Sequence, residues 1–207
     1  FSQGIITRDH RVQKTKEENG TSISFKPDDS IFKNYRFILD YVVNQVRNYT
    51  YLNAGLSIYL NGERYYSKNG LLDLLTDKTE PESIRYPIIH LQGYDIEIAL
   101  THGNNYGEEY YSFVNGQYTS QGGTHLQAFR EGIVNAVRTH FSKNYDVSDI
   151  RASIIAAISV RVQEPVFESQ TKTKLGSTHV APGGETMRTF VTRFVEKEVD
   201  NYLHKNK

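Results

Sequence analysis

Two short polar stretches of this 207-residue chain carry residue types that could bind an anionic group, and one is Ser169–Lys174, "SQTKTK". In an extended segment alternate residues point to the same side, so Gln170 and Lys172 would face one ligand together. A lysine ammonium and a glutamine amide both donate hydrogen bonds, which suits the terminal oxygens of a phosphate. In the alternative interpretation this link caps a short helix, and its lysines point into water. The residues alone leave both interpretations open, and we expect Lys174 to be a solvated lysine of that helix.

The other stretch is "SQGGTH", residues 120–125. A glycine-rich loop that opens a helix can hold an anion with its free backbone N–H groups. The same residues also suit a structural turn, in which Gly122 and Gly123 join a strand to a helix and Thr124 caps that helix. Taken alone, two adjacent glycines favour the structural turn.

Self-contained catalytic signatures are missing from the sequence. It contains no P-loop motif, no zinc-protease motif and no nucleophile elbow. With no cysteine, it has neither disulfides nor thiolate chemistry. The seven histidines are scattered along the chain. Because a metal site needs at least three converging ligands, we expect no metal site.

The composition limits the classes of partner. Lysine plus arginine and aspartate plus glutamate each number 24, so any basic surface for nucleic acid must be local. No apolar run approaches the ~20 residues that cross a bilayer, so we expect a soluble intracellular protein without a membrane partner. The chain starts at Phe1 and its one methionine is Met187, which leads us to expect a fragment of a longer protein.

The first third of the sequence predicts a hairpin followed by a helix. A turn at Asn19-Gly20 precedes the alternating residues Ile23 and Phe25, which indicates the last strand of a hairpin. Apolar residues at helical spacing then predict a helix between residues 31 and 52. A domain boundary near residue 30 follows.

The rest of the sequence predicts an α+β fold. Three or four antiparallel strands are expected, including a hairpin at Asn61-Gly62 and strands within 94–103 and 108–116, with a short helix within 69–76. The later elements are a helix over 124–141, a strand buried on both faces within 152–167, and a long final helix from residue 184 onward. This order predicts a mostly antiparallel sheet covered on one side by helices.

Three longer stretches resemble a known family: "NYTYLNAGLSIYL", "SFVNGQYTSQGGTHLQAF" and "EPVFESQTKTKLGS". In this order they are similar to the B subunits of type IIA DNA topoisomerases, which are DNA gyrase and bacterial topoisomerase IV, and the second stretch leans toward topoisomerase IV. The resemblance implies that residues 31–207 are a transducer domain, with a left-handed βαβ crossover in a two-layer fold related to a ribosomal-protein domain. It implies that residues 1–30 are the last strands of an ATP-binding domain of the Hsp90 and histidine-kinase type.

The resemblance also implies roles for individual residues. Lys172 would contact the γ-phosphate of ATP as the catalytic lysine, with Gln170 beside it, and Gly20 and Thr21 would be remnants of the nucleotide pocket. ATP and Mg²⁺ would bind the full-length protein, whereas this fragment alone is expected to bind neither and to be inactive.

The partners implied are a DNA duplex, a topoisomerase A-type subunit in an A2B2 heterotetramer, and a second B-type subunit that dimerises with the first on ATP binding. The location implied is the cytoplasm, in association with the nucleoid. Weak phosphate contacts to the transported duplex would come from basic residues such as Arg130 and Arg138. The alternative function is a non-catalytic nucleic-acid-binding module of the same fold family, in which Lys172 is only a solvated lysine.

Overall fold

The structure, a computed structural model, describes residues 1–2, 4–18, 20–21 and 23–206. The chain consists of two compact units, residues 1–37 and 38–207. The division lies somewhat beyond the boundary expected near residue 30. The first helix begins at Leu39 rather than near residue 31, because residues 29–34 form successive turns.

In the first unit, the expected last strand through Ile23 and Phe25 does not form. Both residues have irregular backbone and exposed side chains. A strand is stabilised by hydrogen bonds to a neighbouring strand, and the described residues of this unit contain only one isolated bridge, between Ser2 and Ile5. The turn expected before that strand involves Asn19, which lies outside the described residues.

The second unit alternates helices and strands. In chain order its elements are α1 (Leu39–Leu52), β1 (Ser57–Leu60), β2 (Glu63–Tyr66), α2 (Leu71–Lys78), a 3₁₀ turn (Pro81–Ser83), β3 (Ile89–Gln92), β4 (Ile96–His102), β5 (Glu109–Val114), β6 (Gln117–Tyr118), α3 (Thr124–Phe141), α4 (Val147–Arg151), β7 (Ile154–Val160) and α5 (Met187–Lys205). No helix in the described part of the chain is both long and apolar enough to cross a membrane.

The strands form a separate hairpin, β1-β2, and a five-stranded sheet of order β3-β4-β7-β5-β6. Within the larger sheet β7 pairs antiparallel with β4 and parallel with β5. The sheet is therefore mixed, although its other pairings, β3 with β4 and β5 with β6, are antiparallel as expected. The parallel pair arises because the chain leaves β5, forms α3 and returns as β7, and the left-handed sense of this crossover stays a prediction.

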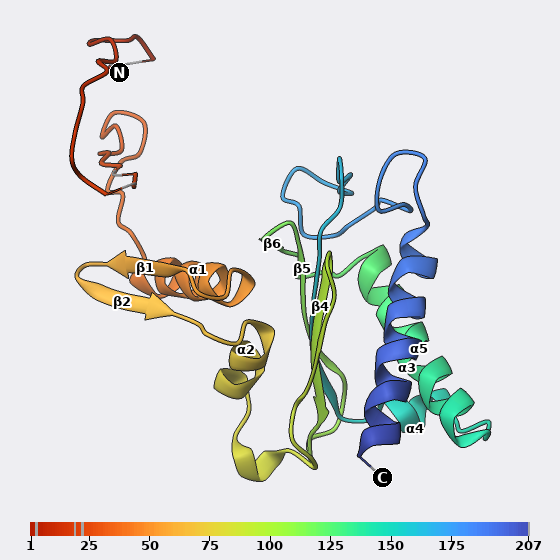
Figure 1. Cartoon of the computed structure of the whole chain (residues 1–207). Coiled ribbons are helices and arrows are strands. Elements are labelled where there is room, and N and C mark those ends of the chain that lie inside the picture. The colour runs from red at the N-terminus through yellow and green to blue at the C-terminus, as the bar shows by residue number, and fades with distance from the viewer. Residues whose placement is uncertain (3, 19, 22, 207) are drawn as a thin grey trace. The chain divides into compact units, whose positions relative to one another are not determined.

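Helices cover both faces of this sheet, so the expectation of cover on one side was wrong. In Figure 1, α3 and α5 lie on one side of the strands and α2 lies on the other. Successive residues of β7 explain the arrangement: Ala156 and Ile158 pack toward α3 and α5, whereas Ile155 and Ala157 pack toward α1 and α2. Because alternate strand residues face opposite sides, an almost continuous apolar run requires two covering layers.

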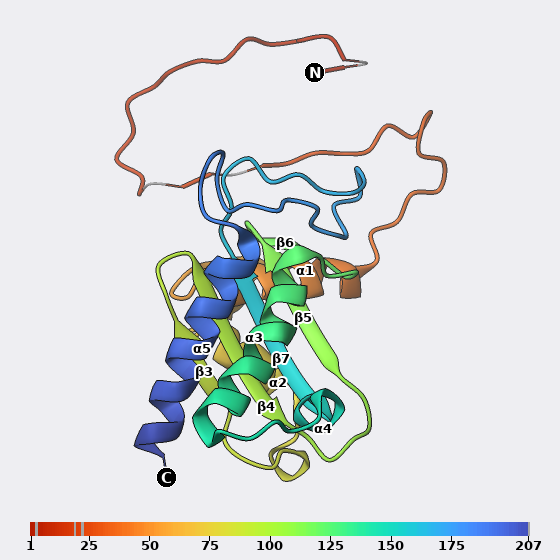
Figure 2. The same ribbon diagram turned by 90° about the vertical axis from the view of Figure 1, so that its right-hand side faces the viewer.

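Helices α3 and α5 lie side by side over one face of the sheet (Figure 2). Gly132 permits their close approach, since a Cβ atom added there would lie 3.1 Å from both Thr192 Cα and Val195 Cβ. The side chain of Thr186 caps α5 by accepting a hydrogen bond from the Thr189 N–H at 3.1 Å. The result is a closely packed helical pair.

Several local predictions are confirmed. The hairpin turn lies at Asn61-Gly62, with positive φ at both residues, 52° and 86°. The short helix within 69–76 is α2, α3 spans the predicted range, and β7 is buried on both faces. The final helix ends with His204 and Lys205 in its last turn, where the helix dipole favours basic side chains.

Candidate functional site

Gln170 and Lys172 lie at the tip of a narrow loop between β7 and α5. Phe167 and Leu175 form an isolated antiparallel bridge at the base of the loop. The Glu168 N–H then donates to the Lys174 carbonyl at 3.0 Å, and the Lys172 N–H donates to the Ser169 carbonyl at 3.0 Å. We call residues 167–175 the lysine loop. Its backbone hydrogen bonds hold the tip as a tight turn.

Two expectations about local structure at this site were wrong: that Gln170 and Lys172 lie in an extended segment, and that this link caps a short helix. Lys172 has a left-handed backbone, φ 55°, so the segment is not extended. No helix follows it among the described residues 172–186. The cause is the turn itself, which the Ser169 and Thr171 hydroxyls reinforce with a hydrogen bond of 2.7 Å. Gln170 and Lys172 therefore share a turn tip rather than one side of a strand.

The two lysines of the lysine loop have different surroundings. The Lys174 ammonium lies 2.9 Å from the Glu168 carboxylate, and its side chain is 35% exposed. The expected solvated helix lysine is thus an ion-paired loop residue. The Lys172 side chain is exposed, and no carboxylate of described residues 38–206 lies within ion-pair distance of it. Of the two cations, Lys172 is the one available to an external anion.

The "SQGGTH" stretch lies against the lysine loop and holds it in place. The Gln121 N–H donates to the Thr173 carbonyl at 2.9 Å and the Thr124 N–H donates to the Leu175 carbonyl at 3.2 Å. In the opposite direction, the Leu175 N–H donates to the Gly122 carbonyl at 3.0 Å. Three backbone N–H groups of this stretch, those of Gln121, Gly122 and Thr124, are therefore occupied by protein carbonyls, which favours the structural turn over the phosphate loop.

Thr124 does not cap α3, contrary to expectation. It is the first residue of the helix, and its hydroxyl donates to the Ser177 carbonyl at 2.6 Å. The residue before the helix is Gly123, which supplies no capping side chain. Thr124 thus ties α3 to the chain that follows the lysine loop.

Gly123 is where the two segments approach most closely. Its φ is +134°, and a Cβ atom added there would lie 2.4 Å from the Leu175 carbonyl oxygen. Only glycine avoids both the strained backbone and the collision. The second glycine of the pair therefore serves backbone contact rather than anion binding.

His125 lies beneath this junction and is fully buried. Its Nε2 atom lies 3.3 Å from the Thr119 hydroxyl, whereas its Nδ1 atom has no hydrogen-bond partner among the described residues. Burial lowers the pKa of His125 to about 4. Its complete burial keeps the imidazole away from solvent and ligands, which favours a structural role over proton transfer.

The remaining expected nucleotide contacts, Gly20 and Thr21, belong to the first unit. Both are exposed and lie in irregular backbone, and their neighbours Asn19 and Ser22 are outside the described residues. Their expected role beside the nucleotide stays a prediction.

Of the two arginines expected to contact DNA, Arg130 is paired with a carboxylate and Arg138 is not. The Arg130 guanidinium pairs with Glu108 at 2.9 Å and lies 5.6 Å from the centre of the Tyr110 ring. Arg138 donates to the Tyr145 carbonyl at 2.9 and 2.6 Å, and no described carboxylate lies within ion-pair distance of it. Both line a cleft of about 400 Å³ between α3 and α4. Arg138 therefore has a positive charge that no described carboxylate offsets. No local pattern in the sequence indicated that Arg130 and Arg151 would share Glu108.

Comparison with known proteins leads to one family. The profile of DNA gyrase B matches residues 38–207. The B-type subunit of DNA topoisomerase 4 from Borreliella burgdorferi is 39% identical over 207 residues, which are all of this chain and 33% of that protein. The B-type subunit of DNA gyrase from Helicobacter pylori is 31% identical over an alignment that covers all of this chain and 28% of that protein. The chain therefore spans about a third of the length of these curated relatives.

Solved structures share the fold. The 43K ATPase domain of Thermus thermophilus gyrase B has a TM-score of 0.68 and 25% identity, over 88% of this chain and 52% of that one. The ATP-binding domain of Francisella tularensis topoisomerase IV has a TM-score of 0.69 over 87% of this chain, at 22% identity.

This fold, with its lysine loop joined to the start of α3, defines a piece of the B-type subunit of a type IIA DNA topoisomerase. The chain belongs to the DNA gyrase B family, and its second unit is the transducer region of that family.

Proposed function

We propose that this chain couples ATP binding and hydrolysis to DNA strand passage in a complete B-type subunit, and that Lys172 and Gln170 contact the γ-phosphate of the bound ATP. The observation that carries the proposal is the free ammonium of Lys172. It lies at the exposed tip of an anchored loop, while neighbouring Lys174 is neutralised by Glu168.

The residues of the tip suit a terminal phosphate but not its metal ion. An ammonium and an amide supply several hydrogen-bond donors to phosphate oxygens. Mg²⁺ takes oxygen ligands, and the carboxylate of this loop, Glu168, is already paired with Lys174. The lysine loop would therefore contact the phosphate but not the Mg²⁺ ion. Bound ATP would supply the anionic group and the phosphoryl chemistry, and this chain would sense it.

The anchoring of the lysine loop supports a mechanical role. A pull on Lys172 would reach α3 through the backbone hydrogen bonds of Thr173 and Leu175. Helix α3 in turn packs along α5, so the second unit would move as one body. ATP would draw this body toward the nucleotide, and loss of the γ-phosphate would release it.

One lysine is too weak to drive this motion alone. A charge-assisted hydrogen bond contributes roughly 1.5–3 kcal/mol, whereas moving a two-state equilibrium from 1:99 to 99:1 needs about 5.5 kcal/mol of differential binding. Dimerisation of the ATP-binding parts of two B-type subunits would supply the rest. In the complete enzyme we place this chain with an A-type subunit in an A2B2 assembly on DNA, on the topoisomerase IV side of the family.

The direct test is Lys172→Ala in the complete B-type subunit, with Lys174→Ala as the matched control. Loss of roughly 1.5–3 kcal/mol at the transition state lowers ATPase turnover by roughly 10- to 100-fold. We expect this loss, with a parallel loss of strand passage, in Lys172→Ala alone. ADP binding should stay unchanged because ADP has no γ-phosphate. Equal turnover of both variants and the parent would refute the assignment.

A calorimetric titration separates this proposal from a non-catalytic nucleic-acid-binding module. A non-hydrolysable ATP analogue should bind the complete protein and should not bind the 207-residue chain tightly. Sequence-specific nucleic-acid binding by the chain alone, unaffected by Lys172→Ala, would favour the binding module instead.

A further inference from the structure

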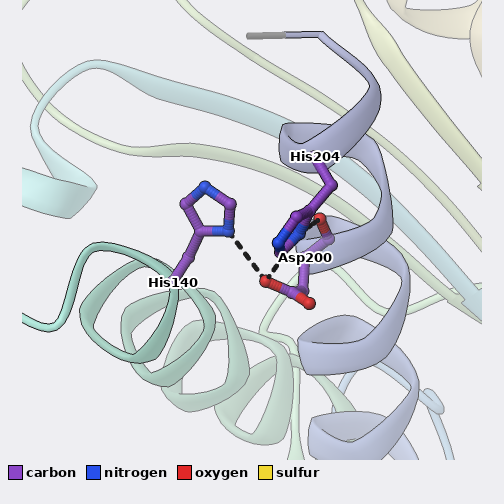
Figure 3. Close-up of side chains that lie close together, drawn as sticks. All are labelled: His140, Asp200 and His204. Carbon is purple, nitrogen blue, oxygen red and sulfur yellow. Dashed lines mark hydrogen bonds and ion pairs between the residues drawn. The ribbon is translucent and has the colours of Figure 1, made fainter.

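Two histidines and an aspartate meet where α3 and α5 end (Figure 3). His140 comes from the last turn of α3, and Asp200 and His204 come from α5. The Nδ1 atom of His140 lies 2.7 Å from Asp200 Oδ1, and the Nδ1 atom of His204 lies 3.3 Å from the same oxygen. One potential ligand atom from each residue falls within 4.8 Å of the others. Two of the seven histidines that are scattered along the sequence thus lie together in the fold.

The parallel packing of the two helices produces this meeting. Contacts between them follow the same order along both: Glu131 with Arg188, then Asn135 with Glu196 at 3.0 Å, then His140 with Asp200. Their C-terminal turns therefore lie together. Since Asp200 and His204 are four residues apart, they share one face of α5 and both reach toward His140.

The electrostatics of this position favour a cation. Each helix carries the equivalent of roughly half a negative charge at its C-terminus, and Asp200 adds a full one. The His140 Nδ1 atom donates a hydrogen bond to this carboxylate at 2.7 Å, so the aspartate oxygen points into the cluster. Two imidazoles and one carboxylate would offer two nitrogen ligands and one oxygen ligand.

We propose that His140, Asp200 and His204 bind a divalent transition-metal ion of the zinc type and thereby join the ends of α3 and α5. Two histidines and a carboxylate are a common zinc ligand set, with a water molecule as the fourth ligand. Bonds of about 2.0–2.2 Å in a tetrahedral site place ligand atoms roughly 3.4 Å apart. In the structure the two Nδ1 atoms lie 2.7 and 3.3 Å from Asp200 Oδ1, and no two of the three ligand atoms are more than 4.8 Å apart. The separation required by a tetrahedral site falls within this range. Small side-chain rotations would complete the site.

The competing explanation is a metal-free cluster. His140 donates to Asp200, and His204 Nδ1 also lies 2.9 Å from the backbone carbonyl of Asp200. In that case these side chains stabilise the helix ends through hydrogen bonds alone. A metal ion must displace the proton that His140 shares with Asp200, so the two explanations predict different responses to added metal.

The test is titration of the untagged 207-residue chain with Zn²⁺ by calorimetry, and with Co²⁺ by visible absorption, which reports the coordination geometry. We expect one saturable site per chain and the intense absorption of a four-coordinate Co²⁺ ion. His140→Ala, Asp200→Asn and His204→Ala should each weaken binding by at least about 10-fold. His10→Ala and His179→Ala, which remove exposed histidines outside the cluster, should bind as the parent does.

His204→Ala is the decisive variant because the side chain is 60% exposed, so its removal should leave the fold intact, as circular dichroism would verify. Absence of a saturable site, or equal affinity of His204→Ala and the parent, would overturn the proposal and leave the metal-free cluster. Loss of binding in His10→Ala or His179→Ala instead would also overturn it.

Discussion

Replacing Gly123 with alanine should break the junction between the glycine loop and the lysine loop. An alanine Cβ would lie 2.4 Å from the Leu175 carbonyl oxygen and 2.5 Å from its backbone nitrogen, so the lysine loop must move away. The movement breaks the hydrogen bonds that join Gln121, Gly122 and Thr124 to the loop. Each contributes about 1 kcal/mol, and the φ of +134° adds a strain of roughly 1–3 kcal/mol for alanine. The expected loss in free energy of unfolding is about 4–6 kcal/mol.

Gly183→Ala is the matched control. Gly183 also has a positive φ, +68°, but nothing lies within 4 Å of an added Cβ atom. Its cost is the left-handed backbone alone, roughly 1–2 kcal/mol. The two variants therefore differ by the steric displacement of the lysine loop and by the hydrogen bonds that it breaks.

Urea unfolding of the 207-residue chain measures the difference. With a slope of about 2 kcal/mol per M, Gly123→Ala should lower the unfolding midpoint by about 2–3 M and Gly183→Ala by less than about 1 M. In the complete B-type subunit, Gly123→Ala should also lower ATPase turnover, because Lys172 loses its anchor. Midpoints within experimental error of each other would refute the claim that Gly123 is required for this contact.

Two further predictions concern pH and DNA. The pKa of His125 is about 4 in the folded chain against 6.5 unfolded, so the unfolded state binds the extra proton between these values and stability falls as pH drops from about 6.5 to 4. The loss in free energy of unfolding approaches about 3 kcal/mol. Urea midpoints measured at several pH values should therefore depend less on pH in His125→Gln than in the parent. An equal dependence on pH in both proteins would exclude His125 as the cause. Arg138→Glu in the complete protein should reduce DNA-stimulated ATPase at low salt and have little effect at high salt, where phosphate contacts are weak. Unaltered stimulation at low salt would remove Arg138 from the DNA-facing surface.

Much of the secondary structure could be predicted because it depends on short-range patterns. The turn at Asn61-Gly62 needs only two residues that tolerate positive φ. The run in β7 was long and apolar enough to require burial on both faces, and α3 had its apolar stripe in the sequence. The motifs "SQTKTK" and "SQGGTH" also drew attention to two segments that lie about 50 residues apart in the sequence and are hydrogen-bonded to each other in the fold.

The conformation of those segments could not be predicted from the motifs. The backbone of Lys172 is left-handed because the loop closes on Ser169, and the pairing of Lys174 depends on Glu168 across the loop. Thr124 bonds Ser177 rather than capping α3, because the returning chain brings a carbonyl within 2.6 Å. Each of these outcomes depends on a partner residue that the folded backbone brings into contact.

By itself the sequence determined the α+β class, the main helices and strands of the second unit, and the polar residues that could hold a phosphate. Only the tertiary structure decided that β5 and β7 run parallel, that helices cover both faces of the sheet, and that Lys172 rather than Lys174 keeps a free charge. It also decided that His140 meets Asp200 and His204. The physical reason is range: propensity and periodicity act over a few neighbouring residues, whereas ion pairing, burial and ligand geometry depend on residues that only the folded chain brings together.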